Sequence, residues 1–143
     1  MDNFLAVEPL IRSRLETGLT GIAAFGSLME FQALSMQAKI FPSVFIGFAG
    51  YVPAGDAPAA SIQQVRQAWA VIIAVRDVTD KDGSLIRGDA GLLMADVMRL
   101  LMGWRPMAGV QPLHLAESPI APWYEGACGY FPMKFTCQFH FKA

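Results

Sequence analysis

The sequence predicts an α+β fold, a small antiparallel or mixed β-sheet with helices packed mainly on one face. Residues 131–142 alternate apolar and polar side chains without a break, which is the period of a strand with one buried face. Residues 43–49 and 63–78 form two further apolar runs with strand character. Residues 3–17 and 89–102 repeat apolar side chains at helical spacing, which indicates helices that cover the sheet.

The N-terminal helix is expected over residues 3–17 and is expected to end at Gly18. Its apolar side is formed by Phe4, Val7, Ile11 and Leu15. Pro9 leaves two alternatives open, because a proline either kinks a helix or belongs to its first turn.

Two short elements and a buried strand are expected next. Residues 20–25 favour a short strand, and residues 28 to about 38 favour a short amphipathic helix. The cap of that helix is expected at Gly26 and Ser27. Neither face of residues 43–49 is polar, which predicts a strand covered on both sides. Residues 50–61 are small and carry two prolines, so we expect a mobile loop there.

The central part of the chain is expected to form a strand, a turn and a helix. The strand covers residues 63–78, and Asp80-Lys81-Asp82-Gly83 has the composition of a turn. The helix covers about residues 89–102, with Asp89 as its N-cap. The stop signals after this helix are Gly103, Trp104 and Pro106.

The last third is expected to hold a short strand at residues 111–116, a loop at 117–126 and the alternating strand. The apolar face of that final strand would meet the helices at residues 3–17 and 89–102. Its polar face would be exposed or would line a wet space.

Length and composition predict one domain over residues 1–143 that hides surface against other subunits. The chain is 54% hydrophobic and only 16% charged, below the roughly 25% of average soluble domains. The charge-free stretch between Lys39 and Asp56 is broken by prolines and glycines, so no membrane-spanning helix is expected. The net charge is −1 without a basic block, so no sequence-specific nucleic-acid binding is expected.

Catalytic, cofactor-binding and metal-binding residues are not predicted. The candidate ligands are His114, His140, Cys128, Cys137, Glu117 and Glu125. No two of them have the close spacing of a zinc motif, and both cysteines are expected to be reduced thiols in or near a strand. The acidic residues at 80–89 only faintly resemble a calcium loop, because Val78 stands where its first ligand would be.

One aromatic segment keeps an enzyme or small-ligand site open as an alternative. It consists of Trp123, Tyr124, Glu125, Cys128 and Tyr130. The favoured interpretation is a loop anchored by its aromatic side chains, since these combine an apolar body with a polar tip.

The helix at residues 89–102 is apolar on two sides. Met94, Met98 and Met102 recur every four residues beside a second stripe of leucine and valine. Such a helix is buried on two sides, either within the domain or partly against a neighbouring subunit.

Four segments together resemble the tail terminator proteins of contractile-tailed and other long-tailed phages, in their Mu-like branch. They are the strand Val71–Asp77 leading into the turn at 80–83, the helix end Gly103-Trp104-Arg105-Pro106, the segment Pro112-Leu113-His114-Leu115, and the alternating final strand. The resemblance covers most of the chain and is looser before Ser43. The helix end is its most specific part, and Pro9 departs from the usual pattern.

The resemblance implies a structural virion protein, without catalysis, that assembles as a homo-oligomeric ring of six. Such a ring sits on the end of the tail tube at the head-proximal end, stops tail polymerisation and offers a surface to the head-completion or neck protein. Its expected partners are therefore the tube protein, the neck protein and, in contractile tails, the tail sheath. Its expected location is the virion tail, reached from the host cytoplasm during assembly.

The residues expected at the subunit interface are Met94, Met98, Met102, Trp69 and Tyr51, with Arg76 and Arg105 as polar anchors. Two other classes remain open at this point: a different neck, tail-completion or tube-like subunit, and a cytosolic ligand-binding oligomer unrelated to phages. Filaments of the pure protein would favour a tube subunit, and a closed ring that does not stack would favour a terminator.

Overall fold

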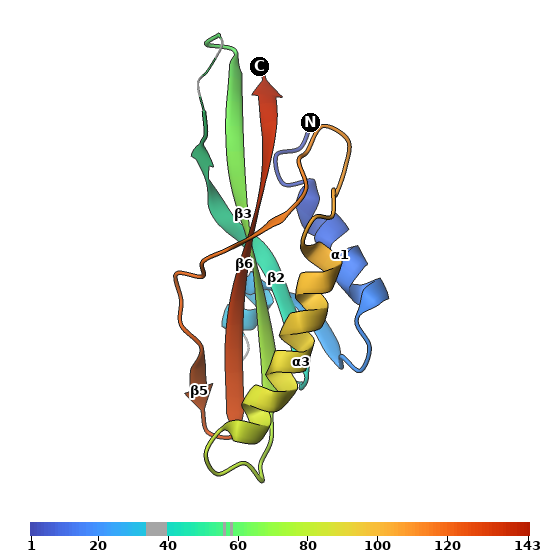
Figure 1. Ribbon diagram of the computed structural model, residues 1–143, viewed down its shortest axis with the longest axis vertical. Coiled ribbons are helices and arrows are strands. Elements are labelled where there is room, and N and C mark those ends of the chain that lie inside the picture. The colour runs from blue at the N-terminus through green and yellow to red at the C-terminus, as the bar shows by residue number, and fades with distance from the viewer. Residues whose placement is uncertain (34–39, 56, 58) are drawn as a thin grey trace.

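The computed structural model describes residues 1–33, 40–55, 57 and 59–143, which form a mixed β-sheet with helices on both faces (Figure 1). Its elements are α1 (Val7–Gly18), β1 (Ala24–Ser27), α2 (Leu28–Ala33), β2 (Ser43–Pro53), β3 (Ile62–Arg76), α3 (Ser84–Leu101), β4 (His114–Ala116), β5 (Trp123–Glu125) and β6 (Cys128–Lys142). The described helices are too short or too polar to cross a membrane. The α+β prediction is confirmed.

The sheet has the strand order β1-β2-β3-β6-β4, and β5 pairs with a second stretch of β6. β1 runs parallel to β2, whereas every other pair is antiparallel. β3 and β6 are the two longest strands, at 15 residues each, and they pair along their whole length with Trp69 opposite Phe135. The molecule is elongated along these strands, with the β2–β3 hairpin at one end and the turn before α3 at the other (Figure 1).

The two faces of the sheet are covered differently. The face that carries Val71, Ile73 and Phe135 packs against α1 and α3 and holds the main core. We call this the helical face. The opposite face carries Ile72 and Tyr130 and is covered by α2 at one end, and we call it the open face. The prediction that helices pack mainly on one face is therefore confirmed, with α2 as the exception.

α1 begins at Val7, four residues later than predicted, and Pro9 lies in its first turn. The backbone nitrogens of the first turn have no carbonyl partner within a helix, so a proline there removes no hydrogen bond. The alternative that places Pro9 in the first turn of the helix is therefore confirmed. The predicted end at Gly18 is confirmed, and Val7, Ile11 and Leu15 are fully buried.

The start of α3 was predicted wrongly. The helix begins at Ser84, five residues before the expected start, and Asp89 lies inside it. Asp80 supplies the missing cap from a distance, because its carboxylate accepts hydrogen bonds from the backbone nitrogens of Gly83 and Ile86 at 2.9 Å each. Gly83 itself has a φ of 81°, a left-handed conformation that favours glycine.

The predicted end of α3 is confirmed within one residue. Gly103 follows the C-terminal Met102 with a φ of 74°, and the backbone nitrogen of Trp104 returns to the carbonyl of Leu101. The guanidinium of Arg14 lies 4.9 Å from the centre of the Trp104 ring, which ties the end of α3 to α1.

The prediction of a mobile loop at residues 50–61 was wrong for the first part of that segment. β2 continues through Tyr51 to Pro53, opposite Gln67 and Val65 of β3, after a register shift between Phe48 and Gly50. Small residues and a proline suggested a loop, but pairing with a long partner strand extends β2 through them. β3 matches its prediction closely, ending two residues earlier at Arg76.

β1 begins at Ala24, four residues later than expected, and it includes Gly26 and Ser27. Parallel pairing with β2 places Gly26 opposite Phe45, whose ring lies 3.0 Å from where a Cβ at Gly26 would stand. The cap at Ser27 is confirmed, since its hydroxyl accepts the backbone N–H of Glu30 at 3.1 Å. Part of the predicted helix to residue 38 lies outside the described residues.

The C-terminal third contains one strand that the sequence did not indicate. β5 lies within the predicted loop at 117–126 and pairs with the start of β6. It is three residues long and stands between Pro122 and Gly126, so it leaves no periodic pattern. β4 is shorter than the predicted strand at 111–116, and β6 begins three residues earlier than expected, at Cys128.

Candidate assembly surface

The residues that could have served chemistry are dispersed or buried. Within the described ranges, no three His, Cys, Asp or Glu side chains gather as a metal site would require. Cys128 and Cys137 are buried on opposite faces of the sheet and form no disulfide. Burial raises the pKa of Cys137 to about 11, so this thiol is neutral at physiological pH and a poor nucleophile.

The methionine stripe of α3 is divided by the structure. Met94 and Met98 pack against the main core, whereas Met102 is 48% exposed. Leu85 and Leu92 are exposed as well, and their spacing of seven residues places them on one outward side of α3. These two leucines were not among the predicted interface residues, because the methionines carry the more regular repeat.

The other predicted interface residues do not form one patch. Trp69 is fully buried in the core against Phe48, so it offers no surface to a neighbouring subunit in this conformation. Tyr51 is 60% exposed and packs its ring edge against Phe4. Arg76 is exposed at the end of β3, and Arg105 is exposed after α3. Contact of the exposed residues with another subunit stays a prediction.

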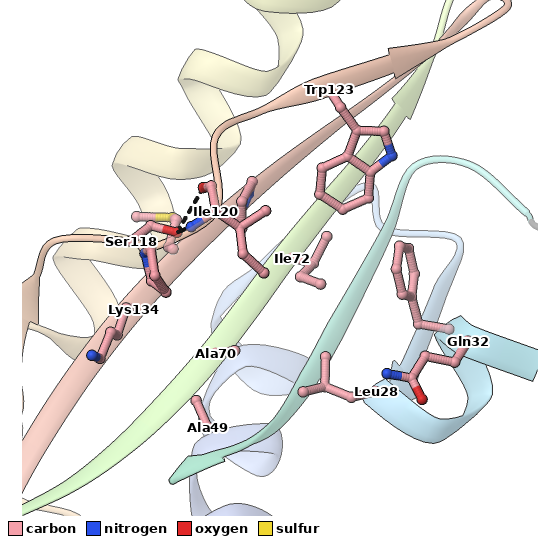
Figure 2. A pocket seen from close by; sticks show the side chains of 13 residues that line it. Leu28, Gln32, Ala49, Ala70, Ile72, Ser118, Ile120, Trp123 and Lys134 are labelled. Atoms are coloured by element: carbon pink, nitrogen blue, oxygen red, sulfur yellow. Dashed lines mark hydrogen bonds between the residues drawn. The ribbon is translucent and has the colours of Figure 1, made fainter. Parts of the chain in front are cut away.

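A cavity of about 260 Å³ opens on the open face of the sheet (Figure 2). Ala70 and Ile72 form part of its floor, Leu28 of α2 forms one side, and Trp123 lies over the opposite side. Ser118 forms a local turn in the loop beside the cavity, because its hydroxyl donates a hydrogen bond of 2.9 Å to the carbonyl of Ile120. The lining is mostly apolar, with Gln32, Ser118 and Lys134 as its polar side chains, so the cavity holds no paired groups for acid–base chemistry.

The aromatic segment considered as a ligand site is split between the two faces. Trp123 stacks on Tyr130 with ring centres 5.0 Å apart, on the open face. Tyr124 packs edge-on against Phe131 on the helical face, and Glu125 is exposed. Burial raises the pKa of Tyr130 to about 12, which keeps its phenol neutral. The segment anchors β5 to β6, as the favoured interpretation expected.

Charge is segregated on the sheet in a way that the overall count of charges does not show. β1, β2, β3, β4 and β6 contain no acidic residue. Their four basic residues are Arg66, Arg76, Lys134 and Lys142. The strand register places all four on the open face, since Arg66 pairs with Gln138 and Lys134 pairs with Ala70. This face is therefore cationic, although the whole chain has a net charge of −1.

The family model for the phage tail terminator protein matches residues 1–143, the whole chain. No curated protein matches this chain. The match agrees with the described geometry, which presents exposed apolar side chains and a cationic sheet face. The chain belongs to the phage tail terminator family and is a structural component of a phage tail.

Proposed function

We propose that this protein caps the head-proximal end of the tail tube as a ring of six copies. The ring stops tail polymerisation and offers its other side to the head-completion or neck protein. The observation that carries the proposal is the family match over the entire chain. Assembly takes place in the host cytoplasm, and in a contractile tail the sheath is a further neighbour.

The distribution of exposed apolar side chains supports assembly with other subunits. Val78 and Leu92 are each 71% exposed, and Ile120 is 56% exposed. They lie on a turn, a helix and a loop respectively, so apolar surface reaches several sides of the molecule. A chain with only 16% charged residues has few groups that would keep such surfaces apart in solution.

The physical mechanism is a difference between the two sides of the ring. A tube end offers a surface that the next tube ring would cover. The cap covers that surface with one side, and its opposite side is not complementary to a tube subunit, so growth stops. Heterologous contacts that close on themselves provide such a ring without open ends.

The test is the morphology of tails assembled without the protein. Tails of uncontrolled length that fail to join heads are expected in its absence, and added purified protein is expected to restore both properties. Tails of normal length that join heads without the protein would refute the proposal. Light scattering over a concentration series, with negative-stain imaging, measures the number of copies per ring.

A tube-like subunit is the second candidate, because the exposed apolar side chains would equally serve contacts between stacked rings. The same imaging separates the two functions. Long filaments of the pure protein would identify a tube-like subunit, whereas closed rings that do not stack would identify a cap.

A further inference from the structure

We propose that copies of this chain join edge to edge, with the outer edge of β2 in one copy pairing with the outer edge of β4 in the next. The inference deepens the proposed function and rests on it for the closure of the ring. It assigns the subunit contact to two strand edges instead of the methionine stripe of α3.

The first edge is the second half of β2. β1 covers β2 only between Ser43 and Ile46, and no strand among the described residues pairs with the outer side of Gly47–Pro53. The backbone nitrogen of Ala54 donates to the carbonyl of Gln64 on the inner side. Hydrogen-bonding direction alternates along an antiparallel strand, so the N–H of Tyr51 faces outward, where it has no ladder partner.

This edge has few of the features that keep monomeric proteins from pairing through their edges. Natural edge strands are protected by charged side chains, prolines, bulges or short length, and of these β2 has one register shift, between Phe48 and Gly50. Residues 40–55 contain no charged residue, and in β2 the only proline is its last residue, Pro53. Tyr51 and Val52, on opposite faces of the strand, are 60% and 49% exposed. The edge is therefore long, apolar and open.

The second edge belongs to β4, which lies at the opposite edge of the sheet. β4 pairs with β6 on one side, with Leu115 opposite Phe135, and no other described strand pairs with it. Three successive antiparallel pairings separate β2 from β4, so the two strands run in opposite directions. If the next copy is added by rotation about an axis along the strands, its β4 meets β2 in antiparallel orientation, and the sheet continues from copy to copy.

The charge of the open face favours this edge contact over face-to-face stacking. Two open faces packed together would bring Arg66 and Lys134 of one copy against the same residues of another, and like charges at close range repel. Edge pairing keeps all of these cations in solvent. It also brings Leu115, which is 43% exposed, to the same side of the joined sheet as Tyr51.

The test is disulfide trapping with one cysteine on each edge. Val52→Cys is combined in turn with Gln111→Cys and with His114→Cys. Val52 lies level with Gln138 of β6, to whose carbonyl the backbone nitrogen of Gln111 donates, and His114 lies farther along the same edge. Within one copy β2 and β4 are three strand spacings apart, roughly 14 Å, which is too far for a disulfide. The native Cys128 and Cys137 stay in place, since they are 4% and 1% exposed.

Oxidation with copper–phenanthroline is expected to give a ladder of covalent oligomers from at least one double variant, both in the concentrated protein and in purified tails. The matched control is Val52→Cys with Leu92→Cys on α3, whose cysteines are exposed but not on two strand edges, and it is expected to stop at background dimers. The edge contact would be overturned if neither double variant gave more oligomers than this control in either sample.

The same samples separate this inference from the proposed function. Closed rings in negative stain that form no edge disulfides would support the ring and contradict the edge contact. A disulfide ladder from open chains would support the edge contact. If tails were also normal in the absence of the protein, the capping function would be contradicted.

Discussion

The side chain of Gln67, fully buried in the middle of β3, donates a hydrogen bond to the backbone carbonyl of Phe4. This contact joins the segment before α1 to the central strand of the sheet. The Phe4 ring lies in a cluster with Phe48, Tyr51 and Phe139 at the same place. The N-terminal segment is therefore part of the packed structure, and Gln67 is the polar contact that fixes it.

Gln67→Met is expected to loosen residues 1–6 while leaving the fold intact. The lost hydrogen bond costs about 1 kcal/mol, and removal of the buried Gln67 Oε1, which has no partner within the described structure, offsets part of that cost. Limited proteolysis and amide exchange at the N-terminus measure the effect. Gln64→Met is the control, since Gln64 bonds to Gln138 on the face of the sheet opposite to Phe4. Unchanged N-terminal protection in Gln67→Met would contradict this role.

Asp80→Ala is expected to lower the free energy of unfolding by about 1–2 kcal/mol, because it removes the carboxylate that caps α3. Asp89→Ala serves as the comparison, since Asp89 is exposed inside the helix and makes no cap. Its effect should stay within about 0.5 kcal/mol. Urea unfolding followed by circular dichroism measures both values. Equal losses in the two variants would show that the helix start is not set by Asp80.

Gly47→Ala is expected to destabilise the protein by about 1–3 kcal/mol through overpacking. A Cβ at Gly47 would stand 2.4 Å from Cγ of Leu28, so α2 would have to move away from the sheet. The double variant Gly47→Ala/Leu28→Ala should be more stable than the sum of the two single effects predicts. Gly88→Ala is the control, because nothing lies within 4 Å of its added Cβ and a helix favours alanine. A strictly additive double variant would rule out the clash.

Raising the pH is expected to reveal the burial of Cys137. Its folded pKa is raised to about 11 from an ordinary value of 9.0, so burial of the neutral thiol contributes stability that is complete below pH 9 and lost between pH 9 and 11. Cys137→Ala should lose less stability than the native protein over that window. The native protein and Cys137→Ala must be compared because Tyr130, with a pKa of about 12, titrates above this pH window in both of them. Parallel pH profiles would contradict the assignment.

The sequence predicted the elements that carry a long periodic pattern and missed those set by distant partners. β3, β6 and the end of α3 were found because alternation and a glycine stop are local signals. The second half of β2 was taken for a loop, since its small residues become a strand only through pairing with β3. The early start of α3 was missed because Asp80 caps it across three residues of turn.

The family was predictable from the sequence, whereas the surface through which the chain assembles stays a proposal. Low charge indicated hidden surface, and the family resemblance is confirmed over the whole chain. The methionine repeat drew attention to side chains of which two pack into the core. Which side chains remain outside depends on how α3 rests on the sheet, and the open strand edges depend on strand order, which sequence periodicity does not contain.

The long strands give each subunit two chemically different poles. One pole is the β2–β3 hairpin, where β2 ends at Pro53 and the basic Lys142 of β6 pairs with Ile62 of β3. The other is the turn that carries Asp77, Asp80 and Asp82. If all copies in a ring keep their strands in the same direction, every hairpin projects from one rim and every acidic turn from the other. Such a ring is directional, so an object that docks on one rim meets a surface unlike the one it would find on the opposite side.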